Sequence, residues 1–259
     1  MSISGRGCGD DGNEGEGSGG RVPLWRRELE LVEQGALLIS SIEEPDLEAQ
    51  VLSKQLDEIA AKVRARVQAR LERDGADPDC TWEVDEILRG LNFVLFEEGG
   101  FHGNEHDYYD PKNSYLHQVL ARKTGIPISL SVLYMCVAAR LGIKMVGVNA
   151  PGHFLLRCYT GPGSKARMLY IDVFNSGRFL DAAELHHLLQ RLGVREDRWE
   201  ERLPTTRPRD LFARMLRNLV VAHRPPDDMR MMQRAAAELG AQSGSWPTSA
   251  AALLEKRVS

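Results

Sequence analysis

A histidine begins a strand-like segment near the middle of this sequence. The run VGVNAPGHFLLR places His153 directly after a small turn, and the later segment YIDVF contains Asp172. A histidine held by a carboxylate has a fixed tautomer and a more basic ring, which are properties of a general base. The same pair also occurs as a structural hydrogen bond between two polar residues at the end of a sheet. Residue types alone leave both interpretations open.

The relative placement of these two residues follows from strand geometry. The segments KMVGVN, HFLLRCY and MLYIDVF are predicted to be strands, and TGPGSKAR is predicted to be the hairpin loop between the last two. A hairpin centred near Gly163 puts His153 opposite Phe174. Asp172 is then its diagonal neighbour, about 7 Å away at the backbone. We therefore predict that the imidazole of His153 and the carboxylate of Asp172 meet across the hairpin.

A catalytic histidine needs a nucleophile, and a helix N-terminus is where a thiol is most easily activated. A central helix is expected from Pro127 to Gly142, and it begins GIPISLS, without a cysteine. Ser129 and Ser131 are present there, but serines in a first helical turn usually bond the local backbone. Cys136 lies deeper in this apolar helix and is expected to be a buried, inert thiol.

Other titratable clusters have spacings that are less specific. The residues His102, His106, Asp107 and His117 include two histidines four apart, but glycine and a turn interrupt any helix there. The usual nucleotide-binding, zinc-protease and serine-hydrolase motifs do not occur. We expect no metal and no cofactor.

Composition excludes several broad classes of function. The chain has 259 residues, of which 42% are hydrophobic, so it can bury a sizeable core. A net charge of −4 gives no basic field for a nucleic-acid partner. No apolar run reaches the roughly 20 residues of a membrane span. The cysteines are far apart, with no CxxC pair, which favours a reducing compartment. We expect a cytoplasmic protein, with an organelle as the alternative.

Patterning divides the chain into four segments. Residues 1–22 are glycine-rich and acidic and are predicted to be a disordered tail. Residues 23–195 form the main domain. Residues 205–240 are predicted to be a helical hairpin that leans on the main domain or begins a helical repeat. Residues 241–259 form a second tail.

Several helices are expected in the first half of the main domain. The runs LWRRELELVEQGALLIS and TWEVDEILRGLNFVLFEE have helical patterns, and between them apolar residues recur three and four apart from Leu56 to Leu71. A short helix is predicted after the turn at Asp110. Asn113 or Ser114 is expected to cap it, and Gly125 to end it.

Three strings also carry a family resemblance. GNEHDYYDPKNSYLHQVLARKTGIPISLSVLYMCVAARLGI, GVNAPGHFLLR and IDVFNSG occur in the order typical of SirB-type regulators. The chain resembles that family over roughly residues 28–192. The family has a transglutaminase-like core and also occurs within a class of F-box proteins. The resemblance implies an α+β, papain-like fold in which N-terminal helices precede a central helix on a small antiparallel sheet. MLRNL, near residue 215, resembles the start of tetratricopeptide-like repeats, here truncated or diverged.

The resemblance also implies roles for individual residues. In active transglutaminase-like enzymes a cysteine opens the central helix, a histidine begins a strand, and an aspartate lies on the next strand. His153 and Asp172 match the last two positions. The cysteine position falls at or beside Pro127, which offers no nucleophile. The motif before the central helix is implied to line the same cleft through Tyr108, Asp110, Asn113 and Ser114.

Two functions follow from these observations. The first is a non-catalytic regulatory or protein-binding module, with a vestigial cleft at His153 and Asp172 and a protein or peptide partner. The second is a hydrolase or acyltransferase that uses the same pair with Ser129 or another unconventional nucleophile. The missing cysteine favours the first, because removing the nucleophile from a triad leaves only weak residual catalysis.

Overall fold

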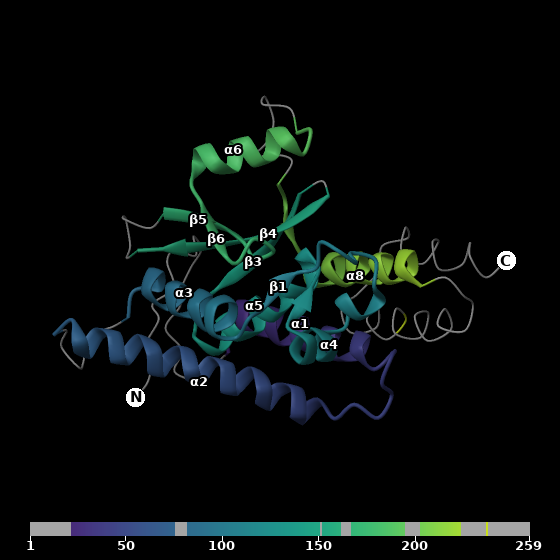
Figure 1. Cartoon of the computed structure of the whole chain (residues 1–259), viewed down its shortest axis with the longest axis horizontal. Helices are drawn as coiled ribbons and strands as arrows, with labels where there is room; N and C mark the ends of the chain where they lie inside the picture. The colour runs from purple at the N-terminus through teal and green to yellow at the C-terminus, as the bar shows by residue number, and fades with distance from the viewer. Residues whose placement is uncertain are drawn as a thin grey trace.

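The computed structural model describes residues 22–75, 82–150, 152–161, 167–194 and 203–223, together with Ala237. The predicted tails lie outside these residues, apart from Val22, and so does nearly all of the second helix of the predicted hairpin. The described part contains seven α-helices and a small antiparallel sheet (Figure 1). The predicted α+β class is therefore confirmed.

The helices predicted in the first half are present. Their bounds are α1 (Leu24–Ser40), α2 (Ala49–Arg73), α3 (Val84–Asn92) and α4 (Leu116–Arg122). The third differs in one respect from the expected regular helix, because α3 continues as the π-helix η1 (Phe93–Glu98). Its wider turns keep both Val94 and Leu95 in the core.

The ends of α4 correct the sequence-based prediction. Neither Asn113 nor Ser114 caps this helix; the first belongs to the 3-10 helix η2 (Pro111–Asn113). The backbone N–H of Leu116 instead donates to the hydroxyl of Ser40, at 3.0 Å, from the end of α1. The helix stops before Lys123, which has a φ of 60°, and not at Gly125. A cap supplied by a residue 76 positions away leaves no local signal in the sequence.

The central helix is α5 (Pro127–Arg140), and the predicted start at Pro127 is correct. Proline suits this position because the first helical N–H has no partner within the helix. Every residue from Pro127 to Ala138 is buried. Helices α1 and α2 pack on one side of α5, and the sheet packs on the other (Figure 1). This burial on all sides agrees with the predicted place of the helix at the centre of the core.

The five-stranded sheet has the order β6-β5-β4-β3-β7, with every neighbouring pair antiparallel. Its strands are β3 (Met145–Ala150), β4 (His153–Thr160), β5 (Arg167–Asp172), β6 (Arg178–Leu180) and β7 (Thr205–Thr206). The first three were predicted, and the two short edge strands were not. A separate parallel pair joins β1 (His102–Gly103) to β2 (Thr124–Gly125). Arg157 pairs with Tyr170, which is the predicted hairpin register.

The two faces of the sheet contribute to different cores. Phe154, Leu156 and Cys158 point into the main core with α5. Leu155 and Tyr170 point the other way, into a smaller core beneath α6 (Ala182–Arg191). Figure 1 shows α6 above the sheet and the remaining helices below it, with α2 as the outermost layer.

Helix α8 (Pro208–Ala222) belongs to the main core. It is the first helix of the predicted hairpin, and it packs against α1. The ring of Phe212 lies over Gly35 so closely that a β-carbon there would be 2.1 Å from the ring. The described helix α8 thus packs against the main domain, as predicted for this region.

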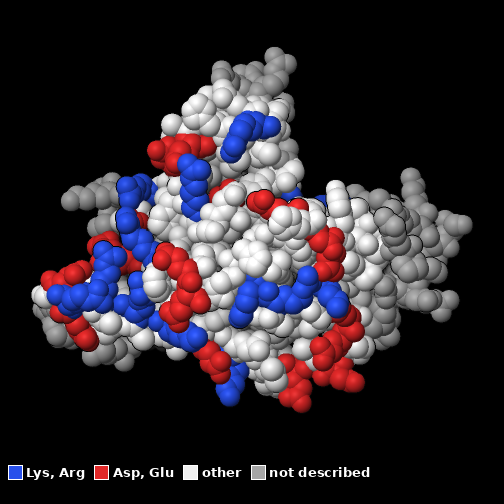
Figure 2. Space-filling view, in the orientation of Figure 1, with Lys and Arg blue, Asp and Glu red and all other residues white. Residues whose placement is uncertain are grey.

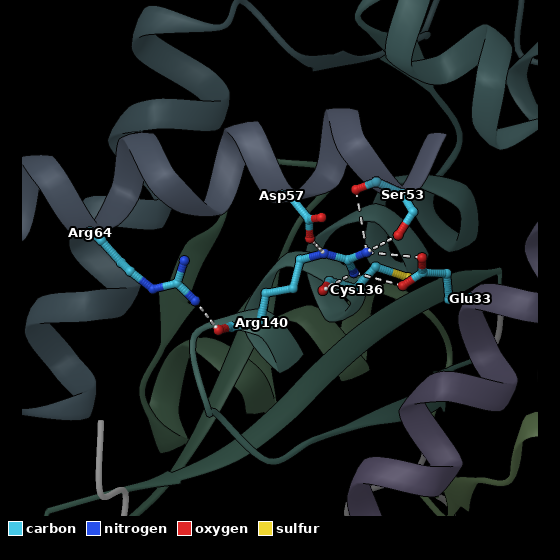
Figure 3. Close-up of polar contacts among 6 residues, drawn as sticks. All are labelled: Glu33, Ser53, Asp57, Arg64, Cys136 and Arg140. Carbon is cyan, nitrogen blue, oxygen red and sulfur yellow. Dashed lines mark hydrogen bonds and ion pairs between the residues drawn. The ribbon is translucent and has the colours of Figure 1, made fainter. Parts of the chain in front are cut away.

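A partly buried ion-pair network joins three helices at the far end of α5 (Figure 3). The guanidinium of Arg140 donates to both carboxylate oxygens of Glu33 on α1, at 2.6 and 2.9 Å. It also donates to Asp57 and Ser53 on α2, at 2.6 and 2.9 Å. Burial lowers the pKa of Arg140, but these hydrogen bonds and charges more than reverse that effect. The network fixes α5 against α1 and α2.

Charged side chains of both signs are interleaved over the face shown in Figure 2, and no region of a single sign covers it. This distribution agrees with the net charge of −4. None of the helices in the described ranges has the length and apolar character needed to cross a bilayer.

Candidate functional site

The structure brings His153 and Asp172 together as predicted. His153 is the first residue of β4, and Asp172 is the last residue of β5. The imidazole Nε2 donates to Asp172 Oδ1 at 2.9 Å. Both residues are buried, with 8% and 3% of their surfaces exposed. The hairpin register places the two residues diagonally across the strand pair, and their side chains are long enough to meet there.

The turn after β5 holds the carboxylate in place. The backbone N–H of Asn175 donates to Asp172 Oδ1 at 3.3 Å, and its side-chain amide donates to Oδ2 at 2.7 Å. Burial by itself raises the pKa of Asp172, but the hydrogen bonds from His153 and Asn175 outweigh it and lower the pKa. The carboxylate is thus ionised at neutral pH and able to orient the imidazole.

A second contact anchors that turn to the main core. Asn92 of α3 donates its side-chain amide to the carbonyl of Gly177 at 2.7 Å. The same side chain accepts a hydrogen bond from the hydroxyl of Tyr134 on α5, at 2.8 Å. The position of Asp172 therefore depends on α3 and α5 as well as on the sheet.

An aromatic ring closes one side of the imidazole. Phe174 meets His153 edge to face, with ring centroids 6.2 Å apart. The other side of Phe174 lies on Gly103 of β1, where a β-carbon would be 2.4 Å from the ring. The β1–β2 pair thereby borders the site, next to the start of α5.

The second ring nitrogen of His153, Nδ1, has no hydrogen-bond partner within the described ranges. With Nε2 donating to the carboxylate, Nδ1 is the nitrogen that can accept a proton or a hydrogen bond from a bound molecule. The site can therefore act as a base or as a hydrogen-bond acceptor, through Nδ1 of His153.

The serines at the start of α5 are not activated by this imidazole. Ser129 is 1% exposed, and its hydroxyl donates to the carbonyl of Asn113 at 2.5 Å. It also accepts from the N–H of Ile126 at 3.1 Å, which satisfies the helix start, as the sequence analysis expected of serines there. Ser131 is fully buried, and its hydroxyl has no partner among the described residues. Neither serine has the base that a nucleophile needs.

The described cysteines are equally unsuited to nucleophilic attack. Cys136 and Cys158 are both buried, and both are free thiols. Burial, with a contribution from Glu33, raises the pKa of Cys136 far above its usual range. Burial and the charge of Asp85 raise the pKa of Cys158 to about 12. Cys8 and Cys80 lie outside the described residues.

The motif before α5 forms a loop held by Asn113. This side chain is fully buried and donates to the carbonyl of Asp107 at 2.7 Å, while it accepts from Asn104 at 3.1 Å. Ser114 is also buried, so neither residue offers surface to a ligand in this conformation. Their burial gives them a positioning role.

Two other residues of the loop do reach the surface. Tyr108 is 36% exposed, and its ring meets that of Tyr109 edge to face, with centroids 5.4 Å apart. Asp110 is paired with Arg122 at 2.7 Å, so its carboxylate already has a partner. Tyr108 is therefore the member of this motif best placed to contact a bound molecule.

Arg214 on α8 contacts the end of β3, a placement that the sequence analysis did not predict. Its guanidinium donates to the side chain of Asn149 and, at 3.5 Å, to the carbonyl of Ala150. Ala150 is the pairing partner of His153 across the turn between β3 and β4. The guanidinium also lies 5.5 Å from the ring centroid of Phe154. Arg214 and Asn149 are 65 residues apart, and the sequence of α8 contains no pattern that would predict their contact.

Metal binding receives no support from the described residues. Nowhere in those ranges do three or more His, Cys, Asp or Glu side chains converge on a common point. His102 bonds the carbonyl of Gly100 and the hydroxyl of Thr124, and His117 lies 2.9 Å from a carboxylate oxygen of Glu43. Two of the histidines considered as zinc ligands, His102 and His117, thus have separate local partners.

A small surface pocket of about 130 Å³ lies between α2 and α3, and none of the site residues lines it. Arg66, Arg70 and Arg89 surround it together with Glu86 and Glu97. The mixed charge of this lining gives no clear chemical preference. The pair of His153 and Asp172 is therefore the better functional candidate.

The fold and the paired histidine and aspartate define a transglutaminase-like protein. The model of the transglutaminase-like superfamily matches residues 50–217, which is more than half of the chain. The chain belongs to this superfamily. No solved structure matches it.

Curated relatives fall into two groups. A UPF0162 protein of Xylella fastidiosa is 39% identical over 188 residues, which cover 71% of this chain and 62% of that protein. A UPF0162 protein of Vibrio cholerae is 32% identical over 149 residues, or 57% of this chain and 49% of the relative. Human F-box only protein 21 is 36% identical over 161 residues, which cover 58% of this chain and 25% of the F-box protein. These matches agree with the resemblance to a family that includes F-box proteins.

Proposed function

We propose that this chain is a non-catalytic, protein- or peptide-binding module of regulatory function. Its cleft is built on the pair of His153 and Asp172, kept for recognition. The observation that carries the proposal is the start of α5, where Pro127 and the fully engaged hydroxyl of Ser129 leave no reactive side chain. The similarity to F-box only protein 21 supports a role in protein interaction.

Three narrower parts of the proposal rest on the sequence. The assignment to SirB-type regulators rests on the three strings that resemble that family. The tetratricopeptide-like start near residue 215 rests on MLRNL, at the end of α8. The cytoplasmic location rests on the cysteine spacing.

A second candidate is a hydrolase or acyltransferase, and one observation favours it. The imidazole of His153 is oriented by an ionised carboxylate, and its Nδ1 is unpaired among the described residues. This is the arrangement of a general base. Ser129 would have to leave its contacts with Asn113 and Ile126 to become the nucleophile. Those hydrogen bonds are the physical reason to place this function second.

Selection of peptides from a random library displayed on phage tests the binding function. We expect selected peptides to bind the wild-type chain and His187→Ala equally, because His187 is an exposed histidine on α6. We expect His153→Ala to bind them at least tenfold more weakly, since one hydrogen bond to a buried site is worth about that much. Equal binding to His153→Ala, or cleavage of the peptides, would overturn the proposal.

A further inference from the structure

One side chain of α3 uses both ends of its amide between the turn after β5 and the central helix. Asn92 is half-buried, and it bonds the carbonyl of Gly177 at 2.7 Å and the hydroxyl of Tyr134 at 2.8 Å. A carbonyl can only accept, so the amide nitrogen must face Gly177 and the amide oxygen must face Tyr134. Burial raises the pKa of Tyr134 well above its ordinary value, so its hydroxyl stays protonated and donates. The orientation of the Asn92 amide is therefore fixed.

The turn that Asn92 holds has an unusual backbone. Ser176 and Gly177 are both left-handed, with φ angles of 56° and 70°. A left-handed serine is unfavourable and persists only where its surroundings impose it. A β-carbon on Gly177 would be 2.2 Å from the amide oxygen of Asn92 and 2.6 Å from the ring of Phe96. Asn92 and Phe96 thus enclose the left-handed part of the turn.

Hydrogen bonds connect this part of the turn to the histidine. The backbone N–H of Arg178, the residue after Gly177, donates to the carbonyl of Asn175 at 3.2 Å. Asn175 in turn donates twice to the carboxylate of Asp172, which accepts from His153. A carboxylate in that place keeps the imidazole proton on Nε2, and Nδ1 can then accept. The tautomer of His153 therefore depends on the shape of the turn.

The junction between α3 and η1 supports Asn92 from the side of the main core. Asn92 is the last residue of α3, and the π-helix begins at the next residue. Phe96 of the π-helix stacks on Tyr134, with ring centroids 6.4 Å apart. Such wide helical turns occur frequently at functional sites. The π-helix thus contacts both the turn and the partner of Asn92 on α5.

We propose that Asn92 is a positioning residue of the candidate site, which keeps Asp172 and the imidazole of His153 in the arrangement that binds the partner. It acts through the turn, because its hydrogen bonds among the described residues go to Gly177 and Tyr134 and not to the pair itself. The inference rests on the proposed binding function and adds a residue outside the pair on which binding depends.

Solvent exchange of the Nε2 proton of His153, measured by NMR on a chain with isotope-labelled histidine, tests this role. The signal is assigned by its absence in His153→Ala. Asn92→Asp has nearly the same size but cannot donate to the carbonyl of Gly177. We expect it to speed the exchange about tenfold, because the loss of one hydrogen bond corresponds to about that factor. We expect it to weaken binding of the selected peptides by a similar factor.

Two further variants make the test specific. Tyr134→Phe removes only the hydroxyl that orients the amide, so it should also speed the exchange, and it takes the place of Asn92→Asp if that variant does not fold. Ser53→Ala is the matched control, since it removes one hydrogen bond from a half-buried group at the far end of α5 (Figure 3). It should leave the exchange as in the wild type. Thermal unfolding checks that each variant is folded.

Two results would overturn the positioning role. One is unchanged exchange in a folded Asn92→Asp chain, and the other is an equal acceleration in Ser53→Ala, which would indicate general loosening of the fold. The proposed function would survive either result as long as His153→Ala loses peptide binding. Faster exchange in Asn92→Asp, with peptide binding unchanged both there and in His153→Ala, would instead overturn the proposed function and leave the positioning of the pair intact.

Discussion

The carboxylate of Asp172 couples the candidate site to the stability of the whole fold. Its pKa lies below the ordinary value of an aspartate, because hydrogen bonds from His153 and Asn175 outweigh burial. A lowered pKa in the folded state means that the ionised carboxylate contributes stability above the unfolded-state pKa of about 4. That contribution disappears as the pH falls through the lower, folded-state pKa.

Replacing this carboxylate by an amide should therefore lower the free energy of unfolding by an amount that depends on pH. We expect Asp172→Asn to lower the free energy of unfolding by about 1–3 kcal/mol near pH 7, since it weakens hydrogen bonds to a charged group. The difference from wild type should shrink as the pH falls below about 4. Urea unfolding at a series of pH values measures it. A difference that stays constant from neutral to acid pH would show that the charge is not responsible.

The contacts at and around the candidate site also show what a sequence can and cannot reveal. The contact between His153 and Asp172 could be predicted because both lie in one hairpin, whose register follows from its loop. Arg214 could not be found in this way, because its acceptor Asn149 is 65 residues away. The cap of α4 by Ser40 was missed for the same reason. Sequence patterns can predict contacts within one hairpin, whereas contacts between distant segments depend on how the helices pack in three dimensions.

At the scale of elements, the position of α5 depends on more than apolar packing. Its N-terminus lies next to the β1–β2 pair that borders the site, and its far end is fixed to α1 and α2 through Arg140. The side chains of Arg140 and Glu33 are only 16% and 18% exposed, so solvent screens this pair weakly. Loss of one partner leaves the other charge unpaired in a poorly hydrated place.

We expect Arg140→Met to destabilise the fold by about 2–4 kcal/mol, slightly less than the loss of a partner from a fully buried pair. Arg178→Met is the matched control, because Arg178 is exposed and pairs with Glu184 at the surface. Its loss should have little effect on the free energy of unfolding, because water screens an exposed ion pair. Denaturant unfolding of both variants makes the comparison, and equal costs would contradict a structural role for the network.

At the scale of the whole molecule, α8 is part of the domain and not an appendage. Its apolar face joins the main core, and its residue Arg214 contacts the end of β3. The boundary predicted between residue 195 and residue 205 thus separates two segments that share one core in the described structure. The predicted hairpin as a whole cannot be compared, since nearly all of its second helix lies outside the described residues.

The contact between Phe212 and Gly35 tests this integration. We expect Phe212→Ala to lower the free energy of unfolding by about 3–5 kcal/mol, because it leaves a cavity between α8 and α1. Val221→Ala is the control on the same helix, since Val221 is 58% exposed and its truncation should have little effect. A cost for Phe212→Ala no larger than that control would mean that α8 is dispensable to the fold.

Peptide mapping by mass spectrometry, after incubation of the folded chain with a fluorophosphonate and with iodoacetamide, tests the absence of a nucleophile most directly. The account predicts that Ser129, Cys136 and Cys158 stay unmodified until the chain is unfolded, since each is buried and none is paired with His153. A stoichiometric adduct on any of the three that forms in the wild type and is lost in His153→Ala would contradict it.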